Sequence, residues 1–155
     1  MIRSLRRALA GVRTAARFER NMRIHICVAA YVILFGALAG LEMWAWAACL
    51  VCIGSVFHAE SHNTSIERLC DFVSPEYSEQ IRVCKDAAAG GVLLAAALSA
   101  AVGAVVFLRA DTLERLWDLA RRRQWLPALP LLLLIPCGFF IRGKKTWKSK
   151  NQASR

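Results

Sequence analysis

The sequence predicts an all-α membrane protein, with an N-terminal interfacial amphipathic helix, three transmembrane helices and a fourth hydrophobic segment near the C-terminus. Hydrophobic residues make up 57% of the 155 residues. Three runs, residues 24–41, 43–59 and 87–108, contain no Asp, Glu, Lys or Arg. Each run is close to the roughly 17 to 25 residues that a transmembrane helix needs. This clustering of charge between apolar runs favours a polytopic membrane protein over a hydrophobic soluble domain.

Residues 2–17 predict a basic amphipathic helix. Apolar side chains recur there at helical spacing, with arginines between them. Such a helix lies in the membrane interface, with its apolar face in lipid and its charges among the headgroups. A solvated basic leader is the alternative interpretation. A cleaved signal peptide is not expected, because the first 23 residues contain several arginines and no uninterrupted apolar stretch.

The connection between the first two runs predicts their topology. Gly40, Leu41 and Glu42 leave room only for a tight hairpin, so the two helices should be antiparallel neighbours. Arginines precede the first run and are absent from the hairpin. By the positive-inside rule, the N-terminus and the loop after the second run then face the cytoplasm.

Charge and cysteine content exclude two other classes of protein. The net charge of +10 would suggest a nucleic-acid partner in a soluble protein. Here the arginines and lysines flank apolar runs and should contact lipid headgroups, so no nucleic-acid partner is expected. Four of the six cysteines lie inside apolar segments, where a thiol behaves as a small hydrophobic group. Buried packing residues are therefore favoured over a redox motif at Cys49 and Cys52.

The polar segment at residues 60–71 is the strongest candidate for a functional site. A helix over residues 43–71 would be roughly 43 Å long, against about 30 Å of bilayer hydrocarbon, so its polar end should project into the cytoplasm. Glu60, Asn63, Glu67 and Asp71 share one face of that helix. Crowded carboxylates repel unless they share a cation, so this stripe predicts a divalent metal, with Mg²⁺ favoured beside phosphate. An ordinary solvated helix end is the alternative.

The segment before the third run offers groups suited to phosphate. A loop at residues 74–78 is followed by Lys85, which provides a point charge, and Asp86 beside it. Both residues have an alternative interpretation as interfacial anchors. The small residues at 87–91 predict close helix packing, within the chain or between subunits.

Three groups of residues, in this order and with this three-span layout, resemble the prokaryotic integral-membrane diacylglycerol kinase and undecaprenol kinase family. They are Glu19-Arg20-Asn21 before Arg23-Ile24-His25, then Glu60-x-x-Asn63-Thr64-x-Ile66-Glu67-x-x-x-Asp71, then Lys85-Asp86-x-Ala88-Ala89-Gly90. The resemblance divides the chain into a membrane lipid kinase domain at residues 1–109 and a basic extension at residues 110–155.

The resemblance implies an ATP- and Mg²⁺-dependent lipid kinase of the bacterial inner (plasma) membrane, with its active site on the cytoplasmic side. By the same resemblance Glu60 is the general base, Glu60 and Asn63 contact the lipid alcohol, and Glu19 and Glu67 bind the metal of Mg-ATP. The other ATP contacts that it implies are Glu76, Tyr77, Ser78, Lys85 and Asp86. It also implies a homotrimer whose active sites combine helices from neighbouring subunits.

The prediction of the acceptor lipid depends on small sequence differences between branches of the family. The Arg23-Ile24-His25 and Asn63-Thr64 variants look more like the undecaprenol kinase branch, so undecaprenol is favoured and diacylglycerol comes next. A different class of function is a non-catalytic membrane scaffold or small transporter subunit, in which the carboxylates would serve an ion path. His58 and His62, on the opposite helix face, are favoured as a hydrogen-bonded interfacial pair over a second metal site.

The C-terminal extension predicts one more interfacial helix and an ambiguous apolar segment. Residues 111–124 have an apolar face, and Asp111 with Glu114 offers a capping box. Residues 126–141 are apolar but contain three prolines, and a lysine-rich end follows. A fourth span would return that end to the cytoplasm, although the run is short and residues 121–123, all arginine, would then lie outside. Both topologies remain open at this point.

Overall fold

The computed structural model describes residues 2–74, 76, 78–123 and 128–142. Within these residues the chain forms six helices and no strand, which confirms the predicted all-α class. The helices are α1 (Ile2–Phe18), α2 (Arg20–Ala39), α3 (Met43–Val73), α4 (Glu79–Phe107), α5 (Ala110–Arg122) and α6 (Ala128–Arg142).

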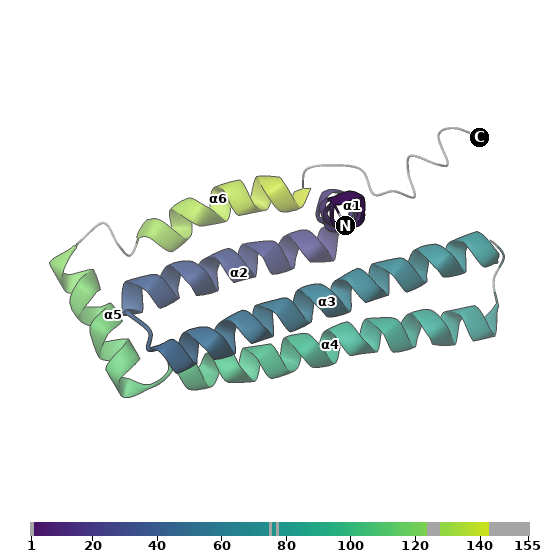
Figure 1. Cartoon of the computed structure of the whole chain (residues 1–155). Coiled ribbons are helices and arrows are strands. Elements are labelled where there is room, and N and C mark those ends of the chain that lie inside the picture. The colour runs from purple at the N-terminus through teal and green to yellow at the C-terminus, as the bar shows by residue number, and fades with distance from the viewer. Residues whose placement is uncertain (1, 75, 77, 124–127, 143–155) are drawn as a thin grey trace.

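Helices α2, α3 and α4 are the body of the protein and lie side by side with alternating direction (Figure 1). Each of the three is long and apolar enough to cross a membrane, as predicted. Both α3 and α4 continue beyond their charge-free runs, and their hairpin extends past the first turn of α2 (Figure 1). The polar end of α3 therefore projects from the bundle, as its length requires.

The turn between α2 and α3 is as tight as the sequence predicts. Gly40 ends α2 in the left-handed conformation, with φ of 61°, which glycine adopts without steric cost. The N–H of Leu41 donates to the carbonyl of Gly36 over 3.1 Å. A Cβ on Gly36 would lie 3.0 Å from Leu41 Cδ1 and 3.1 Å from Trp46 Cη2, so the start of α3 packs closely on the end of α2.

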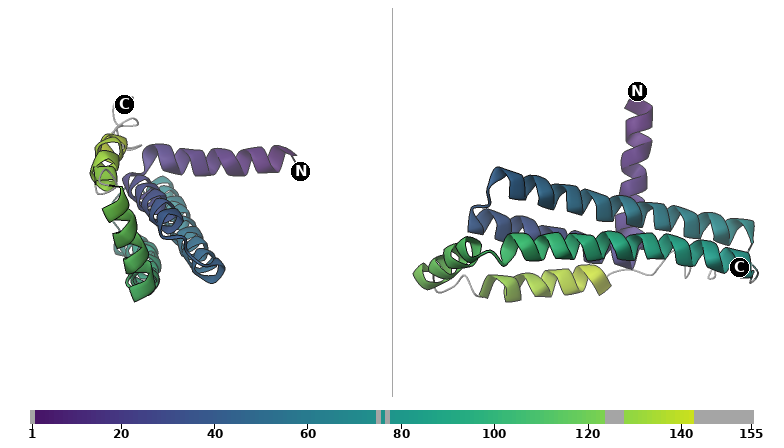
Figure 2. Two further views of the ribbon diagram at one scale, coloured as in Figure 1. Left: turned by 90° about the vertical axis from the view of Figure 1, so that its left-hand side faces the viewer. Right: turned by 90° about the horizontal axis from the view of Figure 1, so that it is seen from below.

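Helix α1 leaves the bundle sideways at the start of α2 (Figure 2). Ala15 is its one buried residue among those described, and Ile2, Leu5, Leu9 and Val12 on its apolar face are all exposed. An exposed amphipathic helix crosswise to a set of membrane helices has the geometry of an interfacial helix. The junction of α1 and α2 therefore marks the level of the membrane surface on the bundle.

The extension packs on α2. Helix α5 lies across the end of the bundle opposite α1, where Arg115 Nη1 donates to the carbonyl of Gly40 over 3.0 Å (Figure 1). Helix α6 then runs beside α2 toward the α1 end. The side chains of Cys27 in α2 and Cys137 in α6 lie close to each other. The 15 residues of α6 span about 22 Å, which is less than the bilayer hydrocarbon core.

Cys27 and Cys137 provide a test of this packing. Treatment of membranes with copper–phenanthroline is expected to join them in most molecules, because oxidation needs only that the two thiols meet. The linked peptides can be detected by mass spectrometry of a non-reduced digest. Exposed Cys84 is the internal control for reaction with the oxidant. Oxidation of Cys84 without any Cys27–Cys137 link would contradict the placement of α6.

Candidate active site

The polar site forms where the junction of α1 and α2 meets α3. Glu19 precedes α2, with an extended backbone at φ −94° and ψ 123°. Its Oε1 accepts a hydrogen bond from Arg68 Nη2 of α3 over 3.1 Å, and both side chains are partly exposed. This ion pair joins residues 49 positions apart and holds the predicted metal ligand Glu19 against α3.

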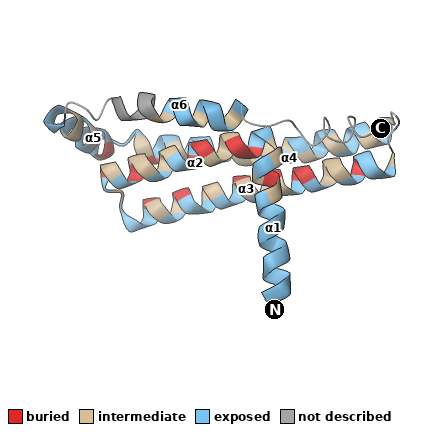
Figure 3. Ribbon diagram, turned by 90° about the horizontal axis from the view of Figure 1, so that it is seen from above, coloured by how far each residue is buried: buried red, intermediate tan, exposed pale blue. Residues whose placement is uncertain are grey.

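The predicted stripe on α3 becomes steadily more exposed away from the membrane. Glu60 is 2% exposed and Asn63 is 6% exposed, whereas Glu67 is half-buried and Asp71 is exposed. The buried residues of the bundle lie mainly along α2 and α3 (Figure 3). Asn63 Nδ2 donates to Glu67 Oε1 over 3.0 Å, which links the buried and half-buried parts of the stripe. Glu60 is therefore the innermost carboxylate, one residue beyond the second charge-free run.

Several buried polar atoms at this site have no hydrogen-bond partner among the described residues. They include Glu60 Oε2, Asn63 Oδ1 and Thr64 Oγ1. The carboxylates of Glu67 and Glu19 also lie close enough to Glu60 to repel it. A buried polar atom without a partner costs about 1 to 3 kcal/mol, and more when it is charged. Such atoms call for a ligand, a water or a functional role.

The oxygen donors fit a metal that arrives with a nucleotide. Among the described residues, no three His, Cys, Asp or Glu side chains gather closely enough to hold a metal by themselves. Mg²⁺ is commonly held by one or two carboxylates together with substrate phosphates and water. Glu19 and Glu67 could supply two such carboxylates. Asp71, which the stripe also includes, accepts a hydrogen bond from Lys85 of α4.

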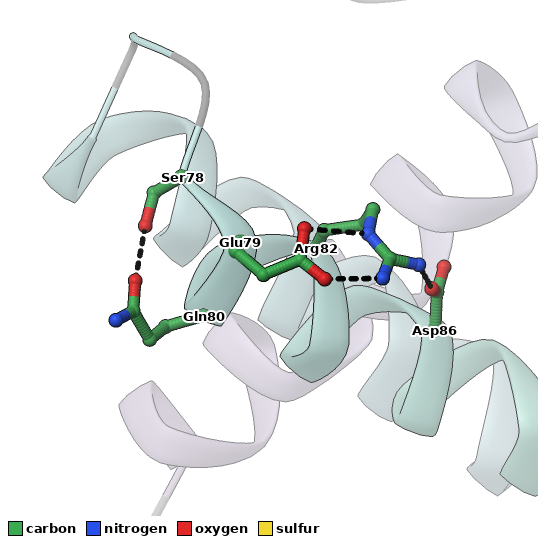
Figure 4. A network of polar contacts seen from close by, with 5 residues as sticks. All are labelled: Ser78, Glu79, Gln80, Arg82 and Asp86. Atoms are coloured by element: carbon green, nitrogen blue, oxygen red, sulfur yellow. Dashed lines mark hydrogen bonds and ion pairs between the residues drawn. The ribbon is translucent and has the colours of Figure 1, made fainter.

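The predicted nucleotide contacts divide into two groups. Lys85 of α4 bonds to Asp71 of α3, so Lys85 contacts the carboxylate stripe directly. Asp86 instead accepts a bond from Arg82 Nη1 over 2.8 Å, and Arg82 also pairs with Glu79 on the exposed surface of α4 (Figure 4).

The remaining predicted contacts lie near the α3–α4 connection. Ser78 Oγ donates to Gln80 Oε1 over 2.9 Å (Figure 4), and Glu76 is exposed. The predicted contact Tyr77 lies outside the described residues. Within the described part of the chain, no hydrogen bond or ion pair joins Ser78, Glu76 or Asp86 to the α3 stripe.

Two arginines that the sequence did not single out, Arg68 and Arg82, organise these groups. Arg68 carried a usable signal, because it is the one Lys or Arg in the polar segment 60–71. Its partner Glu19 is remote in sequence and could not be assigned from spacing. His58 and His62 are both exposed, with ring centroids 4.4 Å apart, and neither contacts the carboxylates in any described bond.

An apolar groove of about 340 Å³ lies between α2, α3 and α4, on the membrane side of Glu60. His25 and Phe57 line it, and Phe57 is less than one helical turn before Glu60. Ser99 also lines it, but its hydroxyl bonds to the carbonyl of Ala95. A mostly apolar groove beside convergent polar groups suits a ligand with a hydrocarbon body and a polar end.

Comparison with known proteins identifies the family. Residues 6–107 match the family described as prokaryotic diacylglycerol kinase. The chain belongs to this family. It is 35% identical over 98 residues to undecaprenol kinase of Bacillus subtilis (strain 168), covering 63% of this chain and 80% of that protein.

A second relative is diacylglycerol kinase of Synechocystis sp. (strain ATCC 27184 / PCC 6803 / Kazusa), 39% identical over 106 residues. That match covers 68% of this chain and 61% of the relative. No solved structure matches the chain significantly.

Membership of the diacylglycerol kinase family makes this protein a lipid kinase. The family implies a lipid substrate and ATP as co-substrate, and the three apolar helices indicate a multi-pass membrane protein. An enzyme, rather than a scaffold or transporter subunit, is the class that these findings support. The family match runs from residue 6, within α1, to the end of α4, and stops before α5 and α6 begin.

The buried carboxylate of Glu60 gives a prediction about stability. Glu60→Gln should raise the thermal unfolding midpoint of the purified, ligand-free protein by several degrees, because a neutral amide replaces a buried, unpartnered carboxylate whose burial costs more than about 1 kcal/mol. Circular dichroism in detergent measures the midpoint. The control Glu114→Gln, at an exposed position in α5, should leave it unchanged. A lower midpoint for Glu60→Gln would show that the charge stabilises the fold.

Proposed function

We propose that this protein is an ATP- and Mg²⁺-dependent kinase that phosphorylates undecaprenol, with diacylglycerol as the second candidate acceptor. The observation that carries the proposal is the unpartnered, buried carboxylate oxygen of Glu60, which follows the groove residue Phe57 by less than one helical turn on the way to the polar end of α3. A lipid alcohol in the groove would bring its hydroxyl to this oxygen. Phosphate-binding groups would lie on the other side, toward the cytoplasm.

Glu60 acts as the general base. A base must lie within hydrogen-bonding reach of the proton that it removes, and Glu60 is the stripe carboxylate closest to the membrane. As the proton passes to Glu60 Oε2, the alcohol oxygen forms a bond to the γ-phosphorus and the bond between that phosphorus and ADP breaks. The electrons of the broken bond leave with ADP, and the phosphoryl group passes directly to the alcohol without a phospho-enzyme.

Glu19 and Glu67 hold the magnesium, and Lys85 contacts the nucleotide phosphates. Magnesium, when bound, neutralises charge that develops on the transferred phosphoryl group. Glu19 is paired with Arg68 in the structure, and this guanidinium would support phosphate binding beside a metal held by Glu19. Glu76, Tyr77, Ser78 and Asp86 complete the proposed nucleotide contacts, and Asn63 contacts the lipid.

The preference for undecaprenol is supported by the coverage of the two relatives. This chain spans 80% of the length of the undecaprenol kinase and 61% of the length of the diacylglycerol kinase. The Asn63-Thr64 pair agrees with the same branch. Identity and the aligned share of this chain are slightly higher for the diacylglycerol kinase, at 39% and 68% against 35% and 63%, so diacylglycerol is kept as the second candidate.

The proposed setting is the bacterial inner membrane, with the site on the cytoplasmic side and three chains sharing their sites. Val106 is the one buried residue described for α4, and Leu93, Leu94 and Leu98 are 67 to 70% exposed. An apolar helix face left so open in one chain is suited to contact with lipid or with neighbouring subunits. These exposed leucines are compatible with the proposed homotrimer.

A direct assay tests the kinase proposal. Protein in mixed micelles with Mg²⁺ and γ-labelled ATP should transfer label to undecaprenol, and more slowly to diacylglycerol when both are offered separately. Glu60→Gln should lower kcat about 10²- to 10⁴-fold through loss of the base, with Glu114→Gln as the unaffected control. Transfer to neither lipid, or full activity of Glu60→Gln, would overturn the proposal.

We further propose that α6 crosses the membrane as a fourth helix, since it runs beside α2 back toward the α1 end. A fluorescent protein fused after residue 155 should then mature in the cytoplasm. Alkaline phosphatase fused after residue 123 should be active outside. The same side reported by both fusions would instead place α6 along the membrane surface.

A further inference from the structure

The hydroxyl of Thr64 has an unusual environment on α3. The residue is 6% exposed, and its Oγ1 is buried without a hydrogen-bond partner among the described residues. Serine and threonine inside a helix commonly bond to the carbonyl four residues earlier. Ser61 donates in this way to Phe57 over 2.8 Å, and Ser65 donates to Ser61 over 2.9 Å. The hydroxyls on either side of Thr64 are thus satisfied, whereas its own is not.

Thr64 lies one helical turn beyond Glu60, on the same side of α3. Residues four apart in a helix have Cβ atoms about 5 to 6 Å from each other. The two side chains carry complementary unpartnered atoms, because Glu60 Oε2 can only accept while ionised and Thr64 Oγ1 can donate. A single oxygen atom placed between them could bond to both.

We infer that Thr64 is a positioning residue, whose hydroxyl donates a hydrogen bond to the acceptor alcohol while that alcohol donates to Glu60. This inference rests on the proposed kinase function. An alcohol oxygen has one proton and two lone pairs. With the proton directed at Glu60 and one lone pair bound by Thr64, the second lone pair is left to attack phosphorus. The two contacts together fix the direction of that lone pair, which is the condition for efficient transfer.

Loss of the Thr64 hydroxyl should change the kinetic constants for the lipid acceptor and leave those for ATP nearly unchanged. Loss of one neutral hydrogen bond costs about 0.5 to 1.5 kcal/mol, which corresponds to roughly 2- to 13-fold. Thr64→Val keeps the shape of the side chain and removes the hydroxyl, so kcat/KM for the lipid alcohol should fall by about that factor. The KM for ATP should stay within about twofold, because Thr64 makes no contact with the nucleotide in this arrangement.

The experiment compares four proteins with undecaprenol and ATP varied separately. Thr64→Ser keeps the hydroxyl and should restore most of the acceptor kcat/KM that Thr64→Val loses. Ser65→Ala is the matched control, because that exposed hydroxyl already bonds to the helix backbone. Thermal midpoints of all four proteins, measured without substrate, show whether any loss reflects the fold.

The outcomes separate the inference from the proposed function. An active wild-type enzyme with acceptor-specific loss in Thr64→Val and rescue by Thr64→Ser supports the inference. An active wild type with unchanged Thr64→Val kinetics overturns the inference alone. Equal losses toward ATP and lipid, with a lower midpoint or altered oligomeric size, show that the hydroxyl serves packing and also overturn it. A wild type inactive toward both lipids overturns the proposed function and the inference with it.

Discussion

The position at which the bilayer boundary crosses α3 governs the whole arrangement. This helix has 31 residues and would be about 46 Å long, whereas the hydrocarbon core is about 30 Å thick. Charged groups are costly inside hydrocarbon, so the charge-free part of α3 ends where the polar stripe begins. Glu60 is the first residue beyond that boundary. The groove on one side and the ion pairs on the other follow from this single change of environment along one helix.

The site combines favourable contacts with atoms left unsatisfied. Ion pairs between Arg68 and Glu19, and between Lys85 and Asp71, bring α2 and α4 to the stripe on α3. Both pairs are partly exposed and contribute modestly to stability, typically below about 1 kcal/mol each. Glu60 and Thr64, nearer the membrane along α3 than either pair, hold buried polar atoms without a partner among the described residues. This combination is typical of a binding site, where stability is given up for interactions with a substrate.

Much of this fold could be predicted from the sequence, because a membrane helix is visible in a sequence as an uninterrupted apolar run. The three spans, the tight turn at Gly40 and the sideways α1 all follow from local composition and charge. The graded stripe on α3 also follows from helical periodicity. The pairing of Glu19 with Arg68 could not be predicted, because it depends on how two helices pack over a long sequence separation. The same holds for Cys27 beside Cys137, since composition alone left the course of residues 126–141 undecided.

The groove beside Glu60 opens on the hydrocarbon side of the site, while Lys85 and Glu67 belong to the part of the hairpin that projects into water. On the proposed mechanism the two substrates therefore approach from different phases and the two products leave into different phases. The lipid never needs to be extracted from the bilayer, a step whose free-energy cost would grow by about 0.8 kcal/mol with every methylene of its chain. The enzyme acts at a phase boundary, and chain length imposes no penalty on turnover through extraction.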